Sequence, residues 1–170
     1  MAISQAMCTS FKSEILDEQH DLAADTIKIA LYTSSASLGA STTAYSTSNE
    51  ISGTGYTAGG ATLSSTTVGT SGTTAYFDAA DPSWTSASFT ANGALIYNDT
   101  NSDKAIAVLA FGGDFTVAGG TFTIIFPAAG ANAIIRIAYN GFILYDKFWH
   151  RGDGHWRSGR DVGCHNKFQL

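Results

Sequence analysis

The chain has 170 residues, of which only 14% are charged, and its formal net charge is −5. This length fits one domain with a sizeable core, and the acidic balance excludes the basic field that recruits nucleic acid. No apolar run approaches the roughly 18 residues that span a bilayer, and the N-terminus lacks the features of a signal peptide. We therefore expect a protein made in a cytoplasm, with neither nucleic acid nor a membrane among its partners.

The first twenty residues predict an amphipathic helix, at about residues 3–20. Ile3, Met7, Phe11 and Ile15 recur every four positions and form one apolar stripe. Acidic residues crowd the C-terminal part, where the helix dipole disfavours them, so the helix should depend on packing. The stripe can pack in the core of its own domain or contact another subunit, and the sequence leaves both open.

After residue 20 the pattern becomes that of β-structure. Residues 26–32 alternate between apolar and polar side chains, which predicts a half-buried strand. Further strand-like segments follow at short spacing without a helix between them, separated by turn signals such as Gly112-Gly113 and Gly119-Gly120. The segments cover residues 61–68, 73–78, 84–90, 93–98, 104–111, 121–126 and 132–138. This arrangement predicts a mainly β fold, namely an antiparallel β-sandwich or small barrel with an N-terminal amphipathic helix.

A long segment without an apolar period, residues 33–60, is rich in Ser, Thr, Ala and Gly. Irregular chain of this length is usually functional or packed against a partner. With Tyr45 and Tyr56, it is therefore a second candidate contact surface beside the helix stripe. Its alternative is to cover an edge strand of its own domain.

The end of this segment, EISGTGYTAGGATL at residues 50–63, holds four glycines within eight residues. A dinucleotide fingerprint needs G-x-G-x-x-G between a strand and a helix. Here the spacing is G-x-G-x-x-x-G-G, and a strand pattern follows. A Walker loop needs a lysine, and none lies between Lys28 and Lys104. We expect these glycines to bend the chain and to allow close backbone approach rather than to bind phosphate.

The composition shifts abruptly at residue 139, which divides a β-domain at 1–138 from a basic, aromatic C-terminal extension at 139–170. Residues 1–138 hold four basic and eleven acidic residues, a balance of −7, whereas the extension holds five and three, a balance of +2. The extension contributes the last candidate interface residues, Phe148, Trp149 and Trp156. Docking on a neighbouring copy and a recently acquired C-terminus are both open interpretations.

Within the extension, the residue types His, Asp and Cys suit zinc, but their spacing does not. They are His150, Asp153, His155, Cys164 and His165. The tripeptide Arg151-Gly152-Asp153 matches an integrin motif that is too short to be informative. Cys8 and Cys164, near opposite ends of the chain, are expected to be isolated thiols, with a disulfide as the alternative.

Catalysis has little support, and we predict no catalytic residue, cofactor or metal. His20 is the one histidine of residues 1–138, and no G-x-S-x-G elbow occurs. The acids of the predicted turns should satisfy backbone N–H groups, although paired carboxylates or a loop calcium site are conceivable. These acids are Asp78, Asp81, Asp99, Asp103 and Asp114. Tyr97-Asn98-Asp99 is the stretch that best fits a glycan-binding platform.

Several strings along residues 1–138 resemble a family of small structural proteins of tailed bacteriophages. They are MAISQAMCTSFKSEIL, IKIALYTSSASLGASTTAYSTSNEISGTGYTAGGATL, ANGALIYN, GGTFTIIFP and AIIRIA, in this order. Members of that family typically stop near the position of Ile137 and Ala138, so nothing carries over to the extension. The resemblance implies a virion component and transfers no catalytic residue.

From the resemblance and the low charge we expect a non-enzymatic virion structural protein, first of all a capsid decoration or head-surface protein in several copies. Its partners would be other copies of itself and the major capsid protein or other virion proteins. One alternative is a component of the neck, tail or fibre base. Another is a lectin-like domain that binds host glycans.

Overall fold

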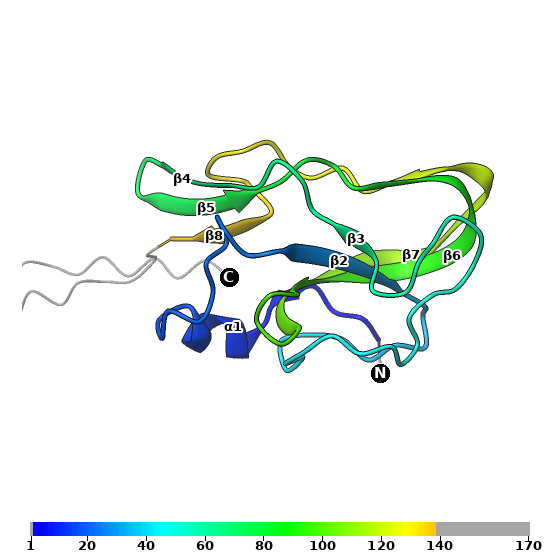
Figure 1. The fold of residues 1–170 in the computed structure, drawn as a ribbon, viewed down its shortest axis with the longest axis horizontal. Helices are drawn as coiled ribbons and strands as arrows, with labels where there is room; N and C mark the ends of the chain where they lie inside the picture. The colour runs from blue at the N-terminus through cyan, green and yellow to red at the C-terminus, as the bar shows by residue number, and fades with distance from the viewer. Residues whose placement is uncertain (1, 139–170) are drawn as a thin grey trace, which may run out of the picture. The chain divides into compact units, whose positions relative to one another are not determined.

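Two antiparallel β-sheets dominate a computed structural model of the chain, which describes residues 2–138 (Figure 1). The larger sheet has the strand order β1-β7-β6-β2-β3 and the smaller one β4-β5-β8. The elements are β1 (Ala6–Met7), α1 (Thr9–Glu14), β2 (Ile27–Tyr32), β3 (Ala61–Thr62), β4 (Thr67–Ser71), β5 (Thr74–Asp78), β6 (Ser83–Asn98), β7 (Lys104–Thr123) and β8 (Ile135–Ile137). The mainly β, antiparallel prediction is confirmed, whereas the barrel alternative is wrong because the sheets do not close.

The core lies where β2 pairs with β6. Ile29 faces Ile96 and Leu31 faces Ala94 across the ladder, and all four are fully buried. The four consecutive residues Ile29–Tyr32 are buried, which means that both faces of β2 are covered. The segment 33–60 covers one of these faces, since the Tyr32 hydroxyl of β2 donates to the Ser46 carbonyl at 2.7 Å. The Tyr45 ring of the segment also stacks on Tyr97 of β6 with centroids 4.7 Å apart.

The long hairpin of β6 and β7 replaces four shorter strands that the sequence predicted. The register slips between Ala91 and Gly93, where residues 111–114 of β7, which include Gly112 and Gly113, lie opposite Asn92 alone, and again beside Gly119. Gly112 and Gly119 have φ of +81° and +67°. The glycine pairs are therefore β-bulges inside one strand rather than turns between two. Figure 1 shows both strands curving along their length, as bulges impose.

The smaller sheet begins with a tight hairpin, in which Ser71 pairs with Thr74 across Gly72 at φ +58°. Strand β8 adds to β5, and the pair Phe77 and Ile135 is buried. The predicted strand 61–68 divides in two, because β3 pairs with β2 in the larger sheet while β4 pairs with β5 in the smaller. This division takes the chain from one sheet to the other.

The predicted helix at 3–20 is wrong in its extent, because α1 spans six residues only. The backbone N–H groups of Ser4 and Cys8 donate to the carbonyls of Leu38 and Ile106, both at 2.9 Å. Met7 pairs with β7 in strand β1. Tertiary backbone pairing therefore keeps the first residues extended, against the four-residue apolar spacing. The predicted extension at 139–170 lies outside the described residues.

Candidate functional site

The glycine-rich stretch lies flat against the backbone of the larger sheet. A Cβ at Gly60 would lie 1.9 Å from the Ile29 carbonyl oxygen, and one at Gly53 would lie 2.3 Å from the Ser88 carbonyl oxygen. Between them, Thr54 forms an isolated bridge with Ser88, beyond the end of β2. The N–H groups of Tyr56, Gly59 and Gly60 donate to protein oxygens. The glycines of the stretch act in close backbone approach, as we expected from the sequence.

The carboxylate of Glu50 anchors this stretch. The hydroxyls of Tyr45 and Tyr56 donate to it, each at 2.6 Å, and the Gly59 N–H donates at 2.8 Å. Burial, and then the hydrogen bond to Glu50, raises the pKa of both tyrosine hydroxyls well above its ordinary value. The hydroxyls of both candidate tyrosines of the loop are therefore hydrogen-bonded inside the domain.

A second polar cluster fixes the chain after α1 to the end of the β6–β7 hairpin. The Glu14 carboxylate accepts from Lys104 Nζ at 2.6 Å and lies 3.0 Å from His20 Nε2. The other ring nitrogen, Nδ1, lies 3.1 Å from the Asn98 amide, which also donates to Asp25 at 2.6 Å. The His20 side chain is fully enclosed. With both ring nitrogens engaged, no atom remains to take a proton from a substrate.

Opposing effects set the pKa of Glu14 within this cluster. Burial raises it, but the hydrogen bonds and charges of Lys104 and His20 outweigh burial and hold the pKa below its ordinary value. The carboxylate is therefore a stabilising ion-pair partner. Nearby, burial and the charge of Glu14 raise the pKa of the Cys8 thiol to about 11, although Lys12 lowers it slightly. Its candidate disulfide partner Cys164 lies outside the described residues.

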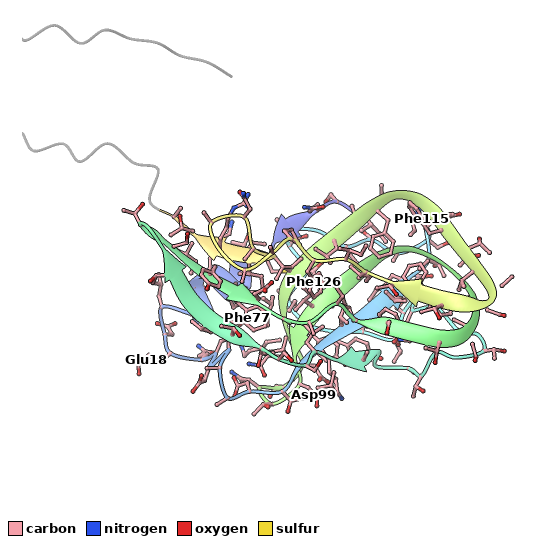
Figure 2. The ribbon with its side chains drawn as sticks, turned by 90° about the horizontal axis from the view of Figure 1, so that it is seen from above. Glu18, Phe77, Asp99, Phe115 and Phe126 are labelled. Carbon is pink, nitrogen blue, oxygen red and sulfur yellow. The ribbon has the colours of Figure 1, made fainter. Side chains whose placement is uncertain are left out.

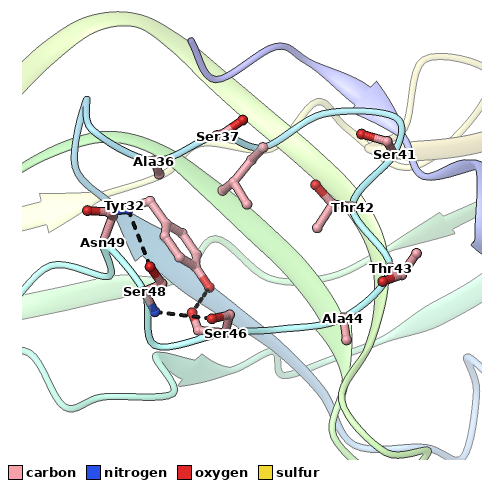
Figure 3. A pocket seen from close by; sticks show the side chains of 11 residues that line it. Tyr32, Ala36, Ser37, Ser41, Thr42, Thr43, Ala44, Ser46, Ser48 and Asn49 are labelled. Atoms are coloured by element: carbon pink, nitrogen blue, oxygen red, sulfur yellow. Dashed lines mark hydrogen bonds between the residues drawn. The ribbon is translucent and has the colours of Figure 1, made fainter. Parts of the chain in front are cut away.

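A shallow pocket of about 340 Å³ opens in the segment 33–60, lined mainly by hydroxyl-bearing side chains (Figure 3). Tyr32 donates to the Ser46 carbonyl at 2.7 Å, and the Thr42 hydroxyl accepts from the Gly39 N–H at 3.0 Å. Burial raises the pKa of Tyr32 to about 12. The pocket offers hydroxyls without a charged side chain or an exposed aromatic face, so it provides no acid–base group at neutral pH.

The prediction of a glycan-binding platform at residues 97–99 is wrong, because two of its three residues are buried. Tyr97 and Asn98 are 1% and 0% exposed, so neither can stack on or bind a sugar. The Tyr97 hydroxyl donates to the Gly59 carbonyl at 2.7 Å. Asp99 forms an ion pair with Lys28 at 2.8 Å. Within residues 2–138, no group of three or more His, Cys, Asp or Glu is placed to hold a metal ion.

An aromatic cluster on the β6–β7 hairpin is covered at one end and open at the other. Trp84 and Phe89 are buried, and the Phe122 ring packs on them with centroids 6.0 and 5.3 Å away. Phe111 continues the cluster, and Phe115 beyond it is 53% exposed. Together with Thr123 and Ile124, the outer three rings surround an open apolar hollow of about 230 Å³. We name these five residues the arm surface.

The arm surface lies beside an uncovered strand edge. Strand β1 pairs with β7 only at Ala107 and Val108. From residue 109 to 123, no strand within residues 2–138 pairs with β7 on the side opposite β6. Unpaired backbone groups beside exposed aromatic rings are the usual features of a protein contact surface.

A separate apolar groove, of about 110 Å³, runs between α1 and the smaller sheet. Phe11, Ile15 and Leu22 line one side, and residues of β4, β5 and β8 line the other. On that other side, Val68 and Ile137 are 53% and 48% exposed. We name the ten residues that line this recess the groove. They are Phe11, Ile15, Leu22, Val68, Ala75, Tyr76, Phe77, Ile135, Arg136 and Ile137.

The structure separates the residues of the predicted helix stripe. Ile3 and Phe11 are buried in the core, Met7 is half-buried in β1, and Ile15 lines the groove. Phe148, Trp149 and Trp156 lie outside the described residues, as do the zinc candidates and the Arg151-Gly152-Asp153 tripeptide. Sequence reasoning missed the arm surface, because it took the glycine pairs on either side of Phe115 for turns.

Comparisons with protein-family models, with curated proteins and with solved structures give no match to this chain. None of the helical structure within residues 2–138 combines the length and the hydropathy of a membrane-spanning segment. The candidate functional surfaces therefore rest on the geometry above.

Proposed function

We propose that the chain is a non-enzymatic structural protein of a tailed-bacteriophage particle, located on the head surface in several copies as a decoration protein. The arm surface is the observation that carries this proposal. It leaves Phe115 more than half exposed beside an edge of β7 with which no strand of residues 2–138 pairs. Such a surface is suited to burial against another protein.

The internal hydrogen bonds of several polar side chains also favour a binding role. Glu50, the loop tyrosines and His20 make their hydrogen bonds inside the domain. Of two open hollows within residues 2–138, one is lined mainly by hydroxyl-bearing side chains and the other mainly by aromatic ones. The resemblance of residues 1–138 to phage virion proteins supplies the kind of particle. The partners are accordingly other copies of this chain and the major capsid protein, assembled in the bacterial host.

The proposal is tested by mixing purified full-length protein with heads and, separately, with tails of the phage that encodes it, followed by co-sedimentation and counting of bound copies. We expect saturable binding to heads. Phe115→Ser should weaken it by about tenfold or more, as for a central aromatic contact. Ile125→Ser is the matched control, since Ile125 is 80% exposed and lies outside the arm surface.

Each outcome of this experiment has a defined meaning. Binding to tails alone would overturn the head location and favour the neck, tail or fibre base. Binding to neither would overturn the virion role. Equal effects of the two substitutions on head binding would show that the arm surface is not the contact.

A further inference from the structure

Two apolar surfaces of different shape, which residues 2–138 leave uncovered, lie at opposite ends of the β-domain. The arm surface follows a strand edge, whereas the groove is a recess between α1 and the smaller sheet. Figure 2 shows Phe115, on the arm, and Phe77, which lines the groove, well separated along the molecule. One copy therefore cannot bring its own arm surface into its own groove, but two copies can meet in this way.

One exposed charge lies beside the arm surface and one lies in the groove, and neither has an ionic partner within the part of the chain that the structure describes. Asp114 is exposed beside Phe115 and accepts a hydrogen bond from Asn92 at 2.8 Å, and no cation pairs with it within residues 2–138. Arg136 is exposed on the β8 wall of the groove, and no carboxylate of residues 2–138 pairs with it. The two charges are of opposite sign.

We propose that the arm surface of one copy docks in the groove of a second copy, with Asp114 of the first beside Arg136 of the second. Phe115 and its neighbouring rings would then cover the apolar walls formed by Ile15, Val68 and Ile137. This inference rests on the proposed function, because it names one of its partners, a second copy. It assigns the arm surface to contact between copies on the head, so that Phe115→Ser would weaken head binding through that contact.

When two copies meet, charge favours contact through the arm surface over contact through other parts of their surfaces. Residues 1–138 carry a balance of −7, which opposes self-association through most of the surface. Residues 105–135, which include the whole arm surface, contain a single charged residue, Asp114. The repulsion between copies is therefore weakest on the arm, where the one negative charge can meet the positive charge of Arg136.

The acids near the groove fix the orientation of the contact. Glu18 and Asp21 lie at a neighbouring hollow that shares Ile15, Leu22 and Val68 with the groove. They repel Asp114 from that end and leave the β8 wall as the favourable side. Because the two surfaces differ, the contact is heterologous, and it repeats from copy to copy until a ring closes or a filament forms.

The test is charge exchange in the purified full-length protein, with association measured by sedimentation velocity from about 1 to 100 μM. Asp114→Arg and Arg136→Glu should each weaken association by about tenfold or more, since close interfacial charge pairs couple by about 1.5 kcal/mol or more. The double variant, which exchanges the two charges, should associate within about threefold of the wild type. Lys12→Glu is the control for Arg136→Glu, because it also replaces a positive charge by a negative one, at an exposed lysine outside the groove.

Three results would overturn the inference: a wild-type protein that stays monomeric over this range, single reversals no different from Lys12→Glu, or a double variant that does not recover. Symmetric pairing of two β7 edges would instead make Asp114→Arg effective and Arg136→Glu silent. Circular dichroism of each variant separates loss of contact from loss of fold. Binding to phage heads is measured separately, so a failure here leaves the proposed function standing on its own test.

Discussion

Replacement of Gly60 by alanine tests whether the glycine-rich stretch exists to bring two backbones together. Gly60 lies at φ +74°, and its new Cβ would lie 1.9 Å from the Ile29 carbonyl oxygen and 2.7 Å from the Ala30 Cα. These atoms belong to β2, which hydrogen-bonded strands hold on both sides. The segment around residues 59–62 must therefore move away instead.

The cost of Gly60→Ala follows from what that movement breaks. It removes the Gly59 hydrogen bond to Glu50, the Tyr97 hydrogen bond to Gly59 and the pairing of Ala61 with Ile29. At about 1 kcal/mol for each, with about 1–2 kcal/mol for the left-handed backbone, the loss is about 4–5 kcal/mol. For a domain of this size that lowers Tm by about 8–20 °C.

Gly72→Ala is the matched control for this prediction. Gly72 lies at φ +58° in the β4–β5 turn, and a Cβ there meets no atom within 4 Å. It should lose only the backbone term of about 1–2 kcal/mol. Urea unfolding followed by circular dichroism gives both free energies. If the two variants differ by less than about 1 kcal/mol, close approach is not what these glycines provide.

Two further predictions concern the polar anchors. Glu50→Ala should lower the free energy of unfolding in urea by about 3 kcal/mol, because three donors lose their acceptor. Tyr45→Phe removes one of these hydrogen bonds and should lower it by about 1 kcal/mol. Equal losses in the two variants would contradict this. Glu14→Gln should destabilise at pH 7 but lose its effect in acid. The folded-state pKa of Glu14 is lowered, so its stabilisation is present above the ordinary value of 4.5 and disappears as the pH falls below it. A pH-independent difference between Glu14→Gln and the wild type would refute the assignment.

Strand β2 of the larger sheet was predictable in its position, although the predicted half-burial was wrong because both of its faces are covered. Residues 26–32 alternate, and β2 forms there because the apolar side chains find cover on one face while the segment 33–60 covers the other. The same patterning placed β5 within a residue. Local pattern succeeds here because burial and strand propensity agree.

Local sequence patterns wrongly predicted turns at the glycine pairs of β7 and a helix at the N-terminal stripe, for related reasons. A glycine pair indicates positive φ, which serves a turn and a β-bulge equally well, and only the partner strand distinguishes them. The stripe from Ile3 to Ile15 has helical spacing, but Ser4 and Cys8 give their N–H groups to distant carbonyls. In both cases the deciding hydrogen bonds come from residues far away in the chain.

The arm surface could not be predicted from the sequence, because the exposure of its side chains depends on whether another segment of the fold packs on them. Phe89 and Phe115 are both phenylalanines in strand patterns, yet one is 7% and the other 53% exposed. The glycine-rich stretch makes part of this difference, since its tight path places Tyr56 over Phe89, with ring centroids 5.9 Å apart. The outer rings of β7 lie beyond its reach. The residues that first suggested a ligand site thus complete the core and, where they end, leave the aromatic surface that a second protein can cover.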